Sequence, residues 1–298
     1  MQRLIRASAT REPAAVAVAQ EGYWRAAWRR LRRHRVAMTG LGIIAAFVAL
    51  AALAPLVSPH DPLAIDYAYP AAPPGTGGHL LGTDAVGRDI LARLIFGTRV
   101  SLQVGVVAVG IAVGLGTAAG LAAGYYGGAL DAALMRTVDV FLAFPVIVLA
   151  IAIIAVLGPS LVNVMIALGL VAWTTYARVV RGQVLVLREL EFVQAARAMG
   201  ASDGRIVLRH VLPNALAPVI VLATLGMATA IIAEAALSFL GLGVQPPTPS
   251  WGTMLNEGRG FLRTAPHIST LPGLAIMVTV LGFNFLGDGL RDALDPRL

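Results

Sequence analysis

Residues 191–213 read EFVQAARAMGASDGRIVLRHVLP, and this polar, charged segment separates two hydrophobic stretches that carry no charge. Its first part can form a short helix, because Gly200 suits the positive φ of a helix C-terminal cap. Ser202 or Asp203 can then cap a second helix that ends at Leu212-Pro213. The segment therefore predicts a helix–turn–helix against the face of a membrane, where small residues let a partner surface approach. The alternative is an ordinary connector without a partner.

The composition indicates an integral membrane protein. Of the 298 residues, 57% are hydrophobic and only 13% are charged, and a soluble fold of this length cannot bury so much apolar surface. The absence of cysteine excludes disulfides, zinc–thiolate sites and thiol nucleophiles. All 23 basic residues are arginine, so the chain lacks the lysine that a phosphate-binding P-loop requires. Any ATP chemistry must therefore sit on another chain.

Six hydrophobic stretches are long enough to cross a bilayer, which takes about 20 apolar residues. The charge-free run after Asp139 is too long for one helix, and Gly158-Pro159-Ser160 divides it into a hairpin. The second stretch carries Gly116, Gly120 and Gly124 on one helical face, which indicates close helix packing. The six expected helices are Val36–Val57, one within Arg99–Asp131, 138–157, 161–179, Ala215–Leu237 and Leu271–Leu290.

The N-terminal region differs from the rest of the chain. Residues 1–20 lack apolar periodicity and are expected to form a disordered cytoplasmic tail. Residues 21–35 place Trp24, Ala27, Trp28 and Leu31 on one helical face and arginines on the other, which predicts an amphipathic helix at the membrane interface. The apolar run that follows is too long for the core of a signal peptide, so we expect a retained first membrane helix.

The arginines also set the expected topology. They concentrate before Val36 and between Arg178 and Arg209, and cytoplasmic segments carry such an excess. Six helices then put both termini and the loop over residues 180–214 in the cytoplasm. Two segments rich in proline and glycine, 58–98 and 241–270, lie outside as candidate contacts for an external partner. This distribution also accounts for the net charge of +7 without a nucleic-acid partner.

Five blocks of sequence, one of which contains the segment 191–213, stand out. They are HLLGTDAVGRDILARLIFGTRVSL (79–102), MRTVDVFLAFP (135–145), EFVQAARAMGASDGRIVLRHVLPNALAPVIV (191–221), EAALSFLGLGVQPPTPSWGTML (234–255) and GDGLRDALDPR (287–297). In this order they resemble the C-type permease subunit of the dipeptide, oligopeptide and nickel group of ABC importers, in the family of binding-protein-dependent transport inner membrane components. The match covers most of the chain beyond residue 30, and the arginine-dense N-terminal extension departs from it. Glu191, Ala195, Ala196, Gly200, Leu212 and Pro213 follow the order and spacing of the family's EAA loop.

The resemblance implies the type I ABC-importer permease fold, in the bacterial inner membrane, and a subunit that is not itself an enzyme. It implies a heterodimer with a sister permease, two cytoplasmic ATPase subunits that hold ATP and Mg²⁺, and an external solute-binding protein; this chain would hold no cofactor. The coupling helix, about 191–203, would sit in a groove of one ATPase. The expected cargo is a di- or oligopeptide, with nickel or glutathione as the alternative. The residues implied to couple are Glu191, Ala195, Ala196, Gly200, Ala201, Ser202, Asp203, Leu212 and Pro213.

Few polar side chains fall inside the predicted spans. Glu234 is a candidate for the translocation path or gate, because a buried acid needs a partner or water. It could also pair with the sister subunit, with Arg259 or with Arg263, and we favour a structural or gating role over substrate binding. Asn284 can hydrogen-bond between helices or line the pathway. No metal site is expected, since no ligand spacing is shown by His60, His79, His210 and His267.

No catalytic residue is predicted, because no Ser/His/Asp, paired-carboxylate or redox constellation stands out. A stand-alone channel or secondary transporter is the alternative from another class. Secondary transporters often carry inverted repeats and buried ionisable groups at the midplane, whereas this sequence shows few central charges and no evident repeat. A membrane-embedded enzyme would need reactive side chains that converge at one depth.

Overall fold

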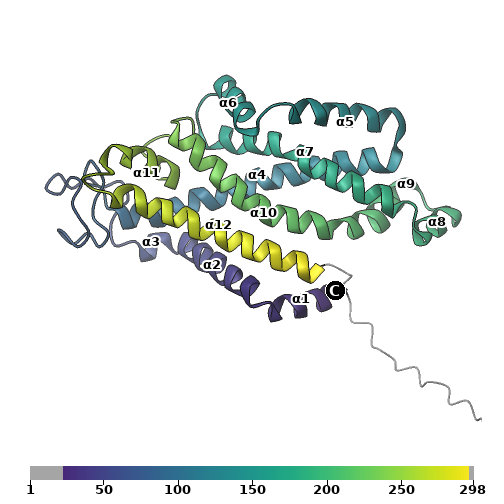
Figure 1. Cartoon of the computed structure of the whole chain (residues 1–298), viewed down its shortest axis with the longest axis horizontal. Coiled ribbons are helices and arrows are strands. Elements are labelled where there is room, and N and C mark those ends of the chain that lie inside the picture. Colours follow the sequence, from purple (N-terminus) through teal and green to yellow (C-terminus); the bar gives the residue numbers. More distant parts are fainter. Residues whose placement is uncertain (1–22, 295–298) are drawn as a thin grey trace, which may run out of the picture.

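The computed structural model describes residues 23–294, and the regular elements of this range are helices (Figure 1). The tail expected over residues 1–20 lies outside the described residues. The elements are α1 (Tyr23–Arg33), α2 (Arg35–Ala52), α3 (Ala54–Val57), α4 (Ile90–Tyr126), α5 (Gly128–Leu142), α6 (Val146–Leu157), α7 (Leu161–Leu187), α8 (Glu191–Ala198), α9 (Asp203–Ile206), the π-helical turn η1 (Val207–Val211), α10 (Leu212–Phe239), α11 (Trp251–Gly258), the 3₁₀ turn η2 (Arg259–Phe261) and α12 (His267–Leu294).

Five helices of the described range are long and apolar enough to cross a membrane: α2, α4, α7, the continuous helix Asp203–Phe239, and α12. There are up to 6 spans if α5 and α6 count as one, although these two helices are bent by 92°. The expectation of one helix over 138–157 is therefore wrong. The chain breaks at Ala143-Phe144-Pro145, because proline has no N–H to donate and disfavours the helical conformation of the residue before it.

Helix α4 begins before the hydrophobic run that predicted it. Its N-cap is Asp89, whose side chain accepts the backbone N–H of Ala92, and the helix continues for 37 residues. At 1.5 Å per residue it is about 55 Å long, and the hydrocarbon core of a bilayer is only about 30 Å thick. The helix is therefore longer than the membrane core is thick, and the last part of the predicted external segment 58–98 is helical.

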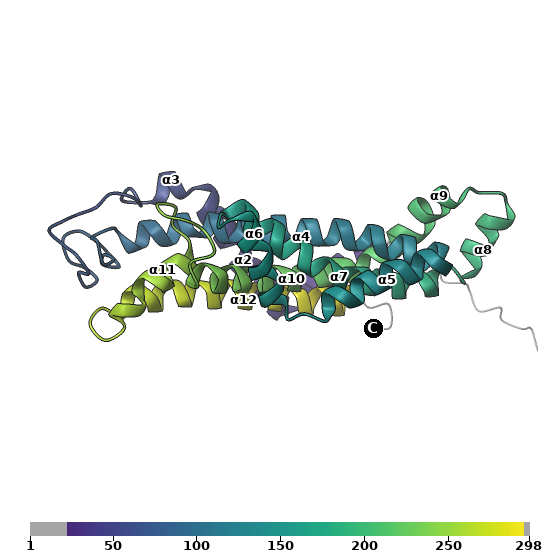
Figure 2. The ribbon, with the colours of Figure 1, turned by 90° about the horizontal axis from the view of Figure 1, so that it is seen from above.

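Figures 1 and 2 show an elongated helix bundle whose two ends carry different structures. The loop between α3 and α4 lies with α11 at one end, and α8 and α9 lie at the other. The two described chain ends also meet, because α1 packs on α12. The two regions expected outside the membrane are thus separated along the bundle from the region expected in the cytoplasm.

The apolar face of α1 is partly buried against the rest of the protein and partly exposed. Ala27 and Leu31 are buried, and Leu31 forms a small cluster with Ala37 and Ala293. Trp28 is exposed, and the Arg32 guanidinium lies 4.9 Å from the centroid of its ring. Helix α1 is therefore fixed to the end of α12 and keeps an aromatic side chain for the interface.

Helices α4 and α7 share the most extensive helix–helix contact of the described chain. Gly116, Gly120 and Gly124 lie along it. A Cβ atom at these positions would stand 2.5, 2.6 and 2.7 Å, respectively, from the nearest atoms of α7. The three glycines therefore let the two helix backbones approach more closely than any residue with a Cβ atom would allow.

Candidate functional site

The connection between α7 and α10 contains α8, a turn and α9. Gly200 ends α8 with a φ of +81°. Its N–H donates to the Arg197 carbonyl at 3.0 Å, and the N–H of Ala201 donates to the Ala196 carbonyl at 3.1 Å. These two bonds are the Schellman pattern, which reverses the chain at a left-handed residue. No atom lies within 4 Å of a Cβ built on Gly200, so the backbone conformation, and not space, requires glycine there.

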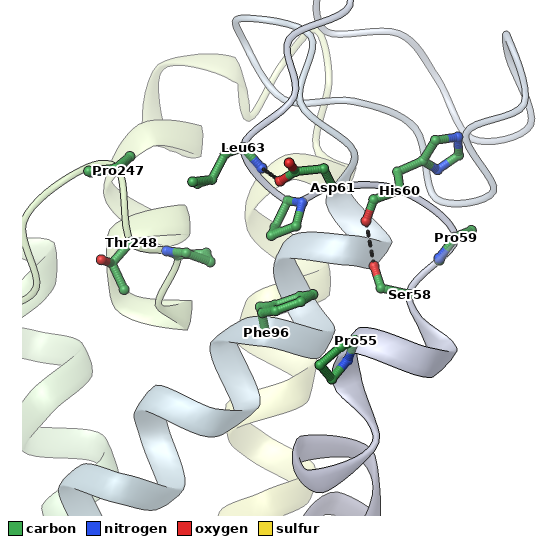
Figure 3. A pocket seen from close by; sticks show the side chains of 11 residues that line it. Pro55, Ser58, Pro59, His60, Asp61, Leu63, Phe96, Pro247 and Thr248 are labelled. Carbon is green, nitrogen blue, oxygen red and sulfur yellow. Dashed lines mark hydrogen bonds between the residues drawn. The ribbon is translucent and has the colours of Figure 1, made fainter.

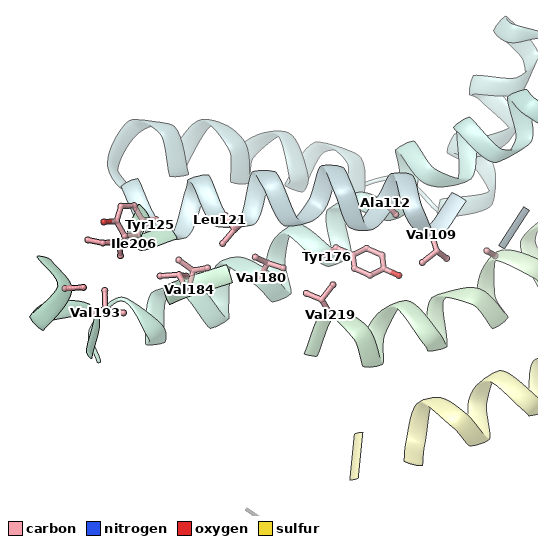
Figure 4. Packing of buried hydrophobic residues seen from close by; sticks show 13 residues of the cluster. Val109, Ala112, Leu121, Tyr125, Tyr176, Val180, Val184, Val193, Ile206 and Val219 are labelled. Carbon is pink, nitrogen blue, oxygen red and sulfur yellow. The ribbon is translucent and has the colours of Figure 1, made fainter. Parts of the chain in front are cut away.

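The inner face of α8 is buried in the chain's own core. Val193 and Ala196 pack with Ile206 of α9 against a cluster that includes Tyr125 and Val184 (Figure 4). The expectation that Ala196 lies open to a partner surface is therefore wrong, since its small side chain lets α8 lie close to its own bundle. Ala195 is exposed, as a contact residue requires.

Polar contacts fix this connection to the end of α4. The Tyr125 hydroxyl donates to Asp203 Oδ1 at 2.6 Å, and Arg197 Nη2 donates to the same hydroxyl oxygen at 3.4 Å. The second bond raises the pKa of the Arg197 guanidinium, which stays charged. Arg188 Nη1 also donates to the Gly124 carbonyl at 2.9 Å. Ser202 takes the N-cap position of α9, but its side chain makes no capping bond.

The outer face of α8 carries apolar side chains that sequence reasoning passed over. Phe192, in the first turn of α8, and Met199, its C-terminal cap, are both exposed, Met199 by 81%. Glu191 is exposed beside them. Exposed apolar groups rimmed by polar ones mark interaction surfaces. The detectable signal was Phe192 and Met199, two large apolar residues beside charged and polar neighbours of α8.

Helix α9 does not end at Leu212-Pro213, where the sequence predicted a stop. It passes through η1 into α10 as one helix from Asp203 to Phe239. Pro213 directly follows the π-helical turn, and a local π adjustment of this kind accommodates a proline inside a membrane helix. Asn214 Nδ2 donates to the carbonyl of His210 at 2.6 Å, which occupies a carbonyl of the π-helical turn. The connection is thus continuous with a membrane-spanning helix.

At the opposite end of the bundle a charge cluster joins α4 to α11. Arg93, which is buried, lies 3.2 Å from Asp84 and 2.8 Å from Glu257, and Arg88 contacts the same two carboxylates at 2.6 and 3.0 Å. Two arginines thus balance two acids. Sequence reasoning counted these arginines only as markers of topology. The signal for their pairing was their position in a block shared with a known family.

The two polar residues predicted for the pathway have different surroundings. Glu234 is fully buried, and its Oε1 accepts the Ser238 hydroxyl at 2.6 Å. Among the described residues it forms no ion pair with Arg259 or Arg263, and Ser238 in turn accepts the Val244 N–H at 3.2 Å. These contacts support a structural role for Glu234 beneath the loop after α10. Asn284 is half-buried on α12.

Solved structures share this fold. One structure of the MetNI methionine ABC transporter in an inward-facing conformation has a TM-score of 0.54 at 22% identity, and the match covers 68% of this chain and 96% of that one. A second inward-facing MetNI structure has a TM-score of 0.55 at 22% identity, with 69% and 98% covered. The spans and the fold together define an integral membrane protein with the fold of an ABC-importer permease.

Sequence comparison identifies the family. Residues 116–298 match the model of the binding-protein-dependent transport system inner membrane component, and residues 22–74 match the N-terminal transmembrane domain of oligopeptide transport permease C. The chain belongs to the family of binding-protein-dependent transport system inner membrane components. The dipeptide transport system permease protein DppC of Alkalihalophilus pseudofirmus is 50% identical over 92% of this chain and 90% of its own length. The glutathione transport system permease protein GsiD of Shigella flexneri serotype 5b is 49% identical over 92% and 91%.

The family expected from the five sequence blocks is therefore confirmed, and with it a permease subunit of an ABC importer in the bacterial inner membrane. Such a permease works with ATPase subunits.

Proposed function

We propose that this chain forms half of a peptide translocation pathway and couples it to a cytoplasmic ATPase through α8. The observation that carries the proposal is the two-sided structure of α8. Its outer face exposes Phe192, Ala195 and Met199, while its inner face is held in the chain's own core by Val193 and Ala196. A partner that grips the outer face must move the inner face with it.

Two connections can carry that movement into the bundle. The hydrogen bond between Tyr125 and Asp203 joins the start of α9 to the end of α4, and α9 continues into α10. Closure of two ATPase subunits would draw α8 and its counterpart on a sister permease together and turn the pathway outward, and hydrolysis would reset it. The ATPases would hold ATP and Mg²⁺, because a chain without lysine has no P-loop of the ordinary kind.

The proposed cargo is a di- or oligopeptide. The relatives named for dipeptide and for glutathione transport are 50% and 49% identical to this chain, and glutathione is itself a short peptide. An external solute-binding protein would deliver the cargo to the end of the bundle opposite α8, where the loop before α4 lies beside α11.

The coupling role is tested by Gly200→Val. Valine at a φ of +81° is strained by about 1–3 kcal/mol, and relief of that strain would undo the turn that orients α8. We expect the variant to insert into the membrane normally and to lose roughly tenfold or more of its association with the ATPases, since each 1.4 kcal/mol is a factor of ten. Quantitative co-purification of the ATPase subunits measures the loss.

Gly204→Val is the matched control. Gly204 lies in α9 with ordinary helical φ, and no atom lies within 4 Å of a Cβ built on it. Valine has a higher helix propensity than glycine, so this change should not weaken α9. The coupling proposal fails if the Gly200 and Gly204 variants retain the same amount of ATPase and transport equally well.

A further inference from the structure

Two histidines that are distant from each other in the sequence meet at one carboxylate before α4. The candidate ligand atoms of His60, His79 and Asp89 all lie within 4.8 Å of one another. His79 Nδ1 is 2.8 Å from Asp89 Oδ2, and His60 Nδ1 is 3.4 Å from the same oxygen. The sequence predicted no metal site because the histidines follow no helical or strand spacing; the folded loop creates the arrangement instead.

Each of the three residues is held in place by a separate contact. Asp89 is buried, and its Oδ1 accepts the Ala92 N–H at 2.7 Å as the N-cap of α4, which leaves Oδ2 to face the histidines. His79 is buried in a tight turn in which its N–H donates to the Thr76 carbonyl at 3.0 Å. The backbone carbonyl of His60 accepts a hydrogen bond from the Ser58 hydroxyl at 2.7 Å. The imidazole ring of His60 points away from the adjacent pocket (Figure 3).

The His60 ring contains an unsatisfied atom. Its Nδ1 is buried and, within the described residues, makes no hydrogen bond of acceptable geometry, although Asp89 Oδ2 is only 3.4 Å away. A buried polar atom without a partner costs about 1–3 kcal/mol. A cation between His60 Nδ1 and Asp89 Oδ2 would satisfy both atoms, which a hydrogen bond at this geometry does not.

The two distances to Asp89 are close to those of a tetrahedral metal site, and the two histidine ligand atoms lie within 4.8 Å of each other. With metal–nitrogen and metal–oxygen bonds of about 2.0–2.1 Å, two tetrahedral ligand atoms lie about 3.3 Å apart. The His60–Asp89 separation of 3.4 Å already meets this value, and the His79–Asp89 pair at 2.8 Å must open by about 0.5 Å. His79 Nε2 also lies 3.7 Å from Asp66 Oδ2, and an approach of about 0.5 Å on metal binding would bring the two atoms into hydrogen-bond distance. A carboxylate on the far nitrogen of a ligating histidine orients the ring and fixes its tautomer.

We propose that His60, His79 and Asp89 bind a divalent transition-metal cation, and imidazole with carboxylate suits zinc. His79 Nδ1 would give up its proton to bind, and the fourth position would be open to water. The cation would pin the loop before α4, through His60 and His79, to the N-cap of that helix. The site lies at the end of the bundle opposite α8, and its existence does not depend on the proposed cargo or on ATPase coupling.

The test measures zinc bound by the full chain purified in its membrane complex with a tag that contains no histidine. After equilibration with Zn²⁺ and removal of free metal, we expect about one zinc per copy and no retention of Mg²⁺, which prefers oxygen ligands. His60→Ala should lower zinc affinity by more than about 100-fold, and Asp66→Asn by about 10- to 100-fold, the usual effect of losing an outer carboxylate. His60 is the ligand to change because its side chain is 37% exposed and it caps no helix.

His267→Gln is the matched control, because this histidine also lies at that end of the chain and contacts the loop through the Ala72 carbonyl at 3.0 Å. It should bind zinc like the unmodified chain. The proposal is overturned if the unmodified chain binds no zinc in excess of the His60 variant, and the three residues then form a hydrogen-bonded structural cluster only.

Discussion

Replacing Glu257 with glutamine is expected to lower the free energy of unfolding by about 3 kcal/mol, because it leaves a buried arginine without its full counter-charge. Arg93 is 1% exposed, and Glu257 and Asp84 are its two carboxylate partners in the described chain. Removal of one acid leaves two arginines to share Asp84. The value lies at the lower end of the range for broken buried pairs, since the Glu257 side chain is 29% exposed.

Thermal and chemical unfolding of the purified membrane complex measure this effect. Glu189→Gln serves as the comparison, because Glu189 pairs with Arg188 at 3.0 Å but is 67% exposed. A surface pair of this kind contributes at most about 1 kcal/mol. Equal losses in the two variants would show that the cluster between α4 and α11 is not a significant source of stability.

The second large effect is expected from Gly120→Leu. A Cβ at Gly120 would stand 2.6 Å from the Ala177 carbonyl oxygen and 2.7 Å from the Cβ of Val180. Neither atom is the end of a flexible side chain, so α4 and α7 must separate along their contact. Overpacking of this kind costs about 1–3 kcal/mol and occasionally more, and we expect about 3 kcal/mol because the backbone itself is displaced.

Gly114→Leu on the same helix is the control, since no atom of the described chain lies within 4 Å of a Cβ built there. Leucine also has a higher helix propensity than glycine, so this variant should be as stable as the original chain or more so. Yield of folded protein after detergent extraction and its unfolding temperature distinguish the two. An unchanged unfolding temperature for the Gly120 variant would mean that α4 and α7 are not as close as described.

The membrane spans and the family were predictable because they depend on patterns that are local in sequence. Charge-free runs of sufficient length indicated most of the spans, and glycines spaced by four indicated the face of α4 that meets α7. The role of Gly200 as a helix C-terminal cap was predictable for the same reason, since such a cap needs a left-handed residue at one position. These signals depend on few neighbours, so tertiary packing does not override them.

The structure differs from the sequence-based predictions at residues whose neighbours are defined only once the chain has folded. Pro145 lies inside an apolar run and bends α5 away from α6, although hydropathy treats both as one span. Ala196 and Ala195 are equally small, and only packing decides that the first turns inward. The loop before α4 contains Gly75, Gly82 and Gly87 at positive φ, and its folding brings His60 to His79, a relation that no spacing rule describes.

The central claim is that this chain is a permease half that uses ATPase partners to import peptides. Uptake of a labelled dipeptide by proteoliposomes tests it most directly, with the chain, a sister permease, two ATPases and the solute-binding protein reconstituted together. We predict uptake that requires ATP and the binding protein and falls with Gly200→Val but not with Gly204→Val. Uptake that proceeds without ATP under an ion gradient, or without the ATPase subunits, would contradict the account.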